Sequence, residues 1–161
     1  MPRRVRDVAV DRPGALVLDA GTRDEIERHL TAALPNEACG LLAASADVDR
    51  WRAERFYPGR NVDASPVRFT MDPREVVAAF DDMEKRGWWL GAIVHSHPRT
   101  PASLSRTDLR EAAYPEALLL VVSFAVRPPA MRAWLLAGDG GDAPREVPIV
   151  VSDRPPANGR R

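Results

Sequence analysis

Two histidines, a serine and an aspartate lie close together between positions 93 and 108, in the stretch IVHSHPRTPASLSRTD. His95 and His97 follow an apolar run that predicts a strand, so their side chains point to one face with Cα atoms about 7 Å apart. Ser105 and Asp108 are three apart in a predicted short helix and share a face of it. If the intervening loop folds back, two imidazoles and one carboxylate can bind a single metal ion.

This ligand set is typical of a catalytic metal site. Two imidazole nitrogens and a carboxylate leave the fourth position of a tetrahedral zinc ion open for water, whereas structural zinc sites are rich in cysteine. The chain has a single cysteine, Cys39. Water activation also needs a base, and no His-Glu-x-x-His motif supplies one beside the histidines. The base must therefore come from elsewhere in the chain.

Simpler or different interpretations of the same residues stay open. Ser-x-x-Asp is also the capping box of an ordinary helix, and two histidines with a carboxylate also form the Fe(II) site of non-haem oxygenases. The complete spacing favours the metal site, because a chance match is expected on the order of once in a thousand chains. We expect Ser105 to begin the helix with its hydroxyl toward the metal, and Asp108 to serve the metal rather than the cap.

Two longer helices have clear start signals. A capping box of Thr22 and Glu25 predicts a helix that ends before Pro35. The pair Asp72-Pro73 predicts a second helix, with the aspartate as cap and the proline at the first helical position, and Gly87 ends it. The predicted buried faces are Ile26, Leu30, Ala33 and Leu34 in the first helix and Val76, Val77, Phe80 and Met83 in the second.

Strand patterns are interleaved with these helices. The last strands are separated only by short turns, at Pro128-Pro129 and at 138–142, which predicts antiparallel pairing between them. The fold class is therefore α/β, a sandwich built on a mixed, curved β-sheet flanked by helices. Strands are predicted at 15–19, 37–44, 51–57, 88–95, 117–125, 131–137 and 147–151, and a short helix at 105–113.

Length and charge limit the classes of function. The 161 residues fit one domain, and 23 basic side chains balance 23 acidic ones, which argues against nucleic acid or an anionic membrane as a partner. The basic start, Met1 to Arg6, lacks the apolar run of a signal peptide, and a single cysteine suits a reducing cytoplasm. We expect a cytoplasmic protein with an N-terminal extension (1–14), one domain (15–151) and a disordered Pro-rich tail (152–161).

Together these residues resemble the signature of the JAMM, or MPN-positive (Mov34/PAD-1), zinc metalloproteases. That signature is a distant upstream Glu, then His-Ser/Thr-His-Pro, then a Ser and an Asp, matched here by Glu37, His95-Ser96-His97-Pro98, Ser105 and Asp108 with the spacing intact. The resemblance covers about Leu16 to Ala137. It includes Glu37-Ala-Cys-Gly-Leu-Leu and a middle segment with Asn61, Ser65-Pro66 and Phe69 to Pro73.

The resemblance implies an MPN (cytidine-deaminase-like) fold and a role for each matched residue. His95, His97 and Asp108 would bind one Zn²⁺ per chain, Glu37 would be the general acid/base on the bound water, and Ser105 would hydrogen-bond the tetrahedral oxyanion. Each role suits the chemistry, since the metal acidifies water and a positioned donor stabilises charge in the transition state.

Among family members, the chain looks most like the small bacterial peptidases that act on ubiquitin-like sulfur-carrier proteins. The implied reaction is hydrolysis after the carrier's C-terminal Gly-Gly, and the implied partner is that tail, which is extended and lacks side chains. The sequence leaves open whether the bond cut is a peptide or an isopeptide bond, and whether the protein is a monomer or a homodimer. A scaffold module like the family's metal-free members, and the Fe(II) oxygenase, are the alternatives.

Overall fold

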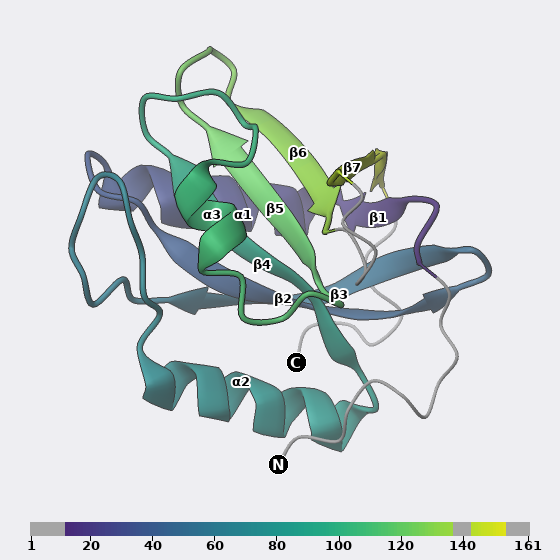
Figure 1. Cartoon of the computed structure of the whole chain (residues 1–161). Helices are drawn as coiled ribbons and strands as arrows, with labels where there is room; N and C mark the ends of the chain where they lie inside the picture. Colours follow the sequence, from purple (N-terminus) through teal and green to yellow (C-terminus); the bar gives the residue numbers. More distant parts are fainter. Residues whose placement is uncertain (1–11, 137–142, 154–161) are drawn as a thin grey trace.

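The computed structural model describes residues 12–136 and 143–153, which form one sheet and three helices (Figure 1). The elements are β1 (Leu16–Asp19), α1 (Ala20–Ala33), β2 (Cys39–Asp47), β3 (Arg50–Gly59), α2 (Pro73–Arg86), β4 (Trp89–His97), α3 (Arg106–Arg110), β5 (Leu118–Ser123), β6 (Ala130–Leu135), β7 (Arg145–Val147) and β8 (Ile149–Ser152).

The strands form a mixed sheet in the order β7-β6-β5-β4-β2-β3-β1-β8. The pairs β4–β5, β1–β3 and β1–β8 are parallel, and the other neighbours are antiparallel. Although only Pro148 separates β7 from β8, these two strands form opposite edges of the sheet. The sheet is therefore curved so strongly that it nearly closes. This confirms the prediction of a mixed, curved sheet flanked by helices.

The prediction of a single strand over 147–151 with antiparallel neighbours is wrong. Pro148 has no N–H to donate to a ladder, so the segment divides there into two strands. β7 pairs antiparallel with β6, while β8 crosses to the other edge and runs parallel to β1. The Pro148 carbonyl then accepts the Leu16 N–H at 2.8 Å.

α1 and α2 cover opposite faces of the sheet (Figure 1). Ile26 and Leu30 of α1 belong to a buried cluster that includes Leu42 of β2 and Val94 of β4. On the other face, α2 packs its buried side chains on Leu41 and its neighbours. The central strands are therefore buried on both faces. Because alternate strand residues face opposite sides, the odd-numbered residues around Leu41 in β2 and around His95 in β4 face the α2 side.

The start of α1 differs from the prediction. The helix begins at Ala20, and its cap is Asp19, whose carboxylate accepts the Thr22 N–H at 3.0 Å as well as the Thr22 hydroxyl. The prediction of a capping box of Thr22 and Glu25 is therefore wrong. The helix begins earlier, and Asp19 at the end of β1 accepts from the N–H groups of the first turn. The Asp72 cap, with Pro73 after it, and the Gly87 stop of α2 are confirmed.

Two residues of the predicted buried faces are exposed. Leu34 is 38% exposed because the helix ends at Ala33 and the Leu34 backbone is no longer helical. Val77 is 61% exposed, since the buried side of α2 is centred on Ala79 and Met83.

Three boundaries near the candidate site also differ. Glu37 precedes β2, which begins only at Cys39, and β4 extends through His97. The helix predicted over 105–113 is the five-residue α3. Both histidines therefore lie within one strand, while Glu37 lies on the segment that leads into its neighbour.

Parts of several predictions fall outside the described residues: the segment 1–6 and most of the extension, the turn at 138–142, and the tail from 154 onward. Within the described ranges, no helix is both long enough and apolar enough to span a bilayer.

Candidate metal centre

The three predicted metal ligands converge at the C-terminal end of β4. The Nε2 atoms of His95 and His97 are 3.2 Å apart. One carboxylate oxygen of Asp108 lies 3.1 Å from the His95 Nε2, and the other lies 3.1 Å from the His97 Nε2. Strand alternation brings the imidazoles together, and α3 folds back to supply the carboxylate.

This geometry fits a bound metal ion. A tetrahedral zinc ion about 2.0 to 2.1 Å from each ligand would separate the ligand atoms by about 3.3 Å, close to the distances observed. His97 Nδ1 donates to the Pro101 carbonyl at 2.7 Å, which leaves the lone pair of a neutral ring on Nε2. That lone pair faces the Asp108 carboxylate and the His95 Nε2, as it would in a shared metal site.

Asp108 acts as ligand candidate and helix cap together. Ser105 Oγ accepts the Asp108 N–H at 3.0 Å, and an Asp108 carboxylate oxygen accepts the Ser105 N–H at 2.8 Å, which completes a capping box. The expectation that Asp108 would not serve the cap is therefore wrong, while its role as a metal ligand stays a prediction. Its two oxygens provide enough lone pairs for both.

The charges of the triad reinforce one another. Burial alone would raise the pKa of Asp108, but hydrogen bonds from His95 and His97 hold that pKa far below its usual range. Burial likewise acts to lower the pKa of His97, and the bonds to Asp108 and the Pro101 carbonyl more than offset this, so the pKa of His97 is raised. In the absence of a metal the site thus favours cationic imidazole beside carboxylate, and a bound cation would replace those protons.

Glu37 is buried, at 5% exposure, and lines the same cavity as His95 and Asp108. Burial is the main reason that the pKa of Glu37 is raised from 4.5 to about 7; nearby His97 lowers it, and Asp108 and Glu111 raise it. A carboxyl with a pKa near neutrality can both accept and donate a proton at physiological pH.

The residue between the two histidines ties Glu37 to the metal centre. Ser96 points away from the ligands, as strand alternation requires, and is fully buried. Its hydroxyl accepts the Ala38 N–H at 2.9 Å, and its own N–H donates to the Ala38 carbonyl at 3.1 Å. Sequence reasoning missed this contact, for which the only signal is a hydroxyl residue between the histidines.

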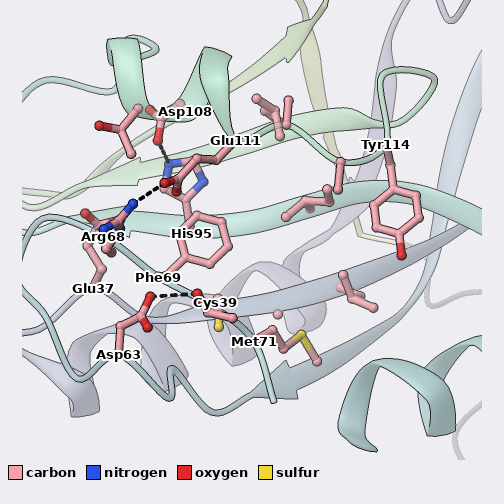
Figure 2. Close-up of a pocket in the computed structure, with 18 of the residues that line it drawn as sticks. Glu37, Cys39, Asp63, Arg68, Phe69, Met71, His95, Asp108, Glu111 and Tyr114 are labelled. Atoms are coloured by element: carbon pink, nitrogen blue, oxygen red, sulfur yellow. Dashed lines mark hydrogen bonds and ion pairs between the residues drawn. The ribbon is translucent and has the colours of Figure 1, made fainter. Parts of the chain in front are cut away.

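The candidate centre opens into a cavity of about 570 Å³ on the α2 side of the sheet (Figure 2). Phe69 stacks on the His95 ring, with centroids 4.8 Å apart and planes inclined by 22°. Arg68 and Glu111 pair across the cavity beside this ring. Its walls are mainly apolar away from the triad, formed by Leu41, Met71, Val76, Ile93, Tyr114 and Leu119.

Cys39 also lines this cavity, and it lies opposite His95 in the β2–β4 ladder. It is buried, and burial raises the pKa of its thiol to about 12. The neutral thiol favours a packing role for Cys39, because only a thiolate is a good nucleophile or metal ligand.

The fold and the site together characterise a class of protein. The sheet is mixed and nearly closed, and its central strand β4 carries two histidines. An aspartate lies on the helix that follows β4, and a buried glutamate lies just before the neighbouring strand β2. Residues 19–137 match the family described as prokaryotic homologs of the JAB domain. The chain therefore belongs to the small prokaryotic branch of the JAMM/MPN family.

Individual relatives cover most of the chain. It is 35% identical over 108 residues to the CysO-cysteine peptidase of Mycobacterium tuberculosis, covering 67% of this chain and 73% of that protein. It is 33% identical over 141 residues to the desampylase of Haloferax volcanii, covering 84% and 96%. A solution structure of a Desulfitobacterium hafniense protein superposes with a TM-score of 0.78 at 39% identity, covering 87% of this chain and 94% of that one.

Proposed function

We propose that the protein is a zinc-dependent peptidase or isopeptidase that hydrolyses the bond after the C-terminal Gly-Gly of a ubiquitin-like sulfur-carrier protein. The observation that carries the proposal is the convergence of His95, His97 and Asp108 within 3.2 Å of one another, beside a cavity that His95 and Asp108 line together with the buried Glu37. Relatives named as a CysO-cysteine peptidase and a desampylase support the reaction class.

His95, His97 and Asp108 would hold the ion. Zinc supplies Lewis acidity when bound, lowering the pKa of a ligated water and polarising the scissile carbonyl. The Glu37 carboxylate would accept a proton from the attacking water and return it to the amine that leaves. In the metal-free protein burial raises its pKa to about 7, and a cation bound nearby would favour the carboxylate form that has to accept the proton.

Ser105 is proposed to donate a hydrogen bond from its hydroxyl to the developing oxyanion. Its Oγ already accepts the Asp108 N–H, and within the described residues the hydroxyl proton has no acceptor. The residue is exposed at the start of α3, where a bound substrate could reach it.

Ser105→Ala tests both roles of this serine. We expect kcat to fall by about 10²- to 10³-fold, the loss typical of one oxyanion donor, and the free energy of unfolding to fall by about 1 kcal/mol through loss of the cap. Ser105→Thr retains a hydroxyl and should restore most of both. Steady-state kinetics with zinc-loaded protein and thermal unfolding measure the two effects, and an unchanged kcat in Ser105→Ala would remove Ser105 from the mechanism.

The shape of the cavity supports a glycine tail as the substrate. Arg68 and Glu111 both line the cavity and pair with each other beside His95 (Figure 2), and we infer that this ion pair restricts the approach to the metal. A chain segment without side chains can pass such a restriction and approach the metal closely. We therefore propose the tail of a ubiquitin-like carrier as the partner, entering as an extended chain.

The remaining features of the proposal follow from the family and the composition. We propose that the sheet and its helices form an MPN (cytidine-deaminase-like) sandwich, that residues 15–151 are the metalloprotease domain, and that the protein acts in the cytoplasm. The ligand spacing also suits an Fe(II) triad, whose cis ligands at about 2.1 Å would lie about 3.0 Å apart. Membership of the JAMM/MPN family favours zinc.

The decisive experiment measures metal content and cleavage together. Purified protein is incubated with ubiquitin-like carriers extended beyond Gly-Gly, and intact mass is followed with and without chelator. We expect about one zinc per chain and chelator-sensitive loss of the extension. Iron with oxygen-dependent turnover would instead indicate an oxygenase, and zinc-independent binding of the carrier without cleavage would indicate a scaffold module.

A further inference from the structure

We propose that Asn61 is a positioning residue. It fixes together the general base Glu37 and the Phe69 ring, which packs on the metal ligand His95. Asn61 belongs to the middle segment that the family resemblance singled out, and the reaction described above assigns it no role. The inference rests on the proposed function, since it concerns the placement of that function's base.

The segment 61–70, called the strap here, is a loop between β3 and α2 with a closed neck. The Asp72 N–H donates to the Arg60 carbonyl at 3.0 Å, and the Val62 N–H donates to the Thr70 carbonyl at 2.9 Å. These backbone bonds close the loop without any side chain. The Asn61 side chain is therefore free to organise the interior of the strap.

That side chain uses all its hydrogen-bonding groups. Its amide oxygen accepts the N–H of Asp63 at 3.1 Å and the N–H of Thr70 at 3.0 Å. Its amide nitrogen donates to the carbonyl of Arg68 at 3.0 Å and to the carbonyl of Glu37 at 3.0 Å. The first three bonds fold the strap, and the fourth leaves it to reach the residue proposed as the base.

Glu37 is held by the strap through both of its backbone groups. Besides the bond from Asn61 to its carbonyl, its N–H donates to the Ser65 carbonyl at 2.8 Å. The next residue, Ala38, is bound on its other side to Ser96, between the two histidines. The segment that carries the base thus lies between the strap and the strand that carries the metal ligands.

The same side chain fixes the other active-site contact of the strap. Asn61 binds the backbone on both sides of Phe69, at the Arg68 carbonyl and the Thr70 N–H, and the Phe69 ring stacks on His95. Asn61 does not line the metal cavity, so it acts through Glu37 and Phe69 and not on the substrate.

Loss of the two hydrogen bonds that the Asn61 amide donates, to the Glu37 and Arg68 carbonyls, should displace Glu37 without removing the metal. Two ligands are held independently of the strap, His97 by the Pro101 carbonyl and Asp108 by the Ser105 box. The third, His95, contacts the Phe69 ring of the strap, but its backbone is fixed in β4 between β2 and β5. A shift of the base on the order of 1 Å can cost about 10²-fold in rate, because proton transfer needs hydrogen-bond distance. The loss should appear in kcat and not in zinc affinity.

Asn61→Asp is the test variant, because it keeps the acceptor oxygen and replaces the two-donor amide with an oxygen that faces two carbonyls. We expect kcat to fall about 10- to 100-fold, with KM within threefold and zinc affinity within twofold of wild type. The Glu37 amide should exchange with solvent at least tenfold faster. Asn61→Gln, which keeps both groups on a longer side chain, should lie between, and it carries the test if Asn61→Asp does not fold.

Ser65→Ala is the matched control in the same strap. It removes the hydroxyl that accepts the Val67 N–H at 3.2 Å but leaves the Ser65 carbonyl that binds Glu37. We expect wild-type kcat and wild-type exchange at Glu37. An equal loss of kcat in Ser65→Ala would show that strap integrity, not the bond to Glu37, matters, and would overturn the inference.

The outcomes separate this inference from the proposed function. If the wild-type protein shows no chelator-sensitive cleavage, the proposed function fails, and the role of Asn61 in catalysis fails with it. If the wild type cleaves and folded Asn61→Asp matches it in kcat, or loses zinc in proportion to its lost activity, only the inference about Asn61 fails.

Discussion

Glu37→Gln is expected to abolish cleavage and, at the same time, to make the zinc-free protein more stable at pH 8. Glutamine fills the same space but cannot accept a proton, so kcat should fall by at least about 10²- to 10⁴-fold, the range for loss of a general acid or base. The carboxyl is buried at 5% exposure, and its pKa is raised mainly by that burial, from 4.5 to about 7.

The sign of the stability change follows from this raised pKa. Below about pH 4.5 the carboxyl is protonated in both the folded and the unfolded chain, so it contributes no pH-dependent difference. Between pH 4.5 and 7 the unfolded chain releases the proton first, and the folded state loses stability as pH rises. Above pH 7 the full cost, about 3 kcal/mol, destabilises the wild type and is absent from Glu37→Gln.

Denaturant unfolding of the zinc-free proteins at pH 4.5 and pH 8 measures this difference. The gain of Glu37→Gln over wild type should be near zero at the lower pH and largest at the higher one. Glu84→Gln, on the exposed side of α2, is the matched control and should change stability by less than about 0.5 kcal/mol at either pH. Equal stability of Glu37→Gln and wild type at pH 8 would contradict the buried, raised-pKa description of Glu37.

Asp108→Ala is expected to lower zinc affinity by more than about 100-fold, since even partners outside the ligand shell cost 10- to 100-fold when lost. Cleavage should become undetectable at ordinary zinc concentrations. Because Asp108 also accepts the Ser105 N–H, the same change removes half of a capping box and should destabilise α3 by about 1 kcal/mol.

Asp108→Asn separates the two roles of this side chain. Its amide oxygen can still accept the Ser105 N–H, so the cap should survive, while a neutral amide is a weak zinc ligand. Competition with a fluorescent chelator measures zinc affinity, and metal-free thermal unfolding measures the cap. Retention of zinc by Asp108→Ala at wild-type affinity would show that the triad is not the metal site. Asp81→Asn, at an exposed position of α2, is the control and should leave zinc affinity and metal-free stability unchanged.

Several elements could be predicted because their signals are local. The Asp72 cap with Pro73 after it, and the Gly87 stop, depend on backbone groups within a few residues, and the structure has them as predicted. The shared direction of His95 and His97 follows from strand alternation alone. The cap of α1 was mispredicted because Asp19 and Thr22 both have local cap signals, and only the end of β1 decides between them.

The sequence by itself determined the identities and spacing of the proposed metal ligands, the base and the serine, since residue chemistry and strand or helix periodicity are properties of short segments. Only the tertiary structure decided how they meet. Ala38 and Ser96 are bonded across 58 residues, the strap binds Glu37 through Asn61, and β7 and β8 close opposite edges of one sheet. Contacts of this kind depend on sheet register and loop closure, which are set by the whole packed chain and not by any local pattern.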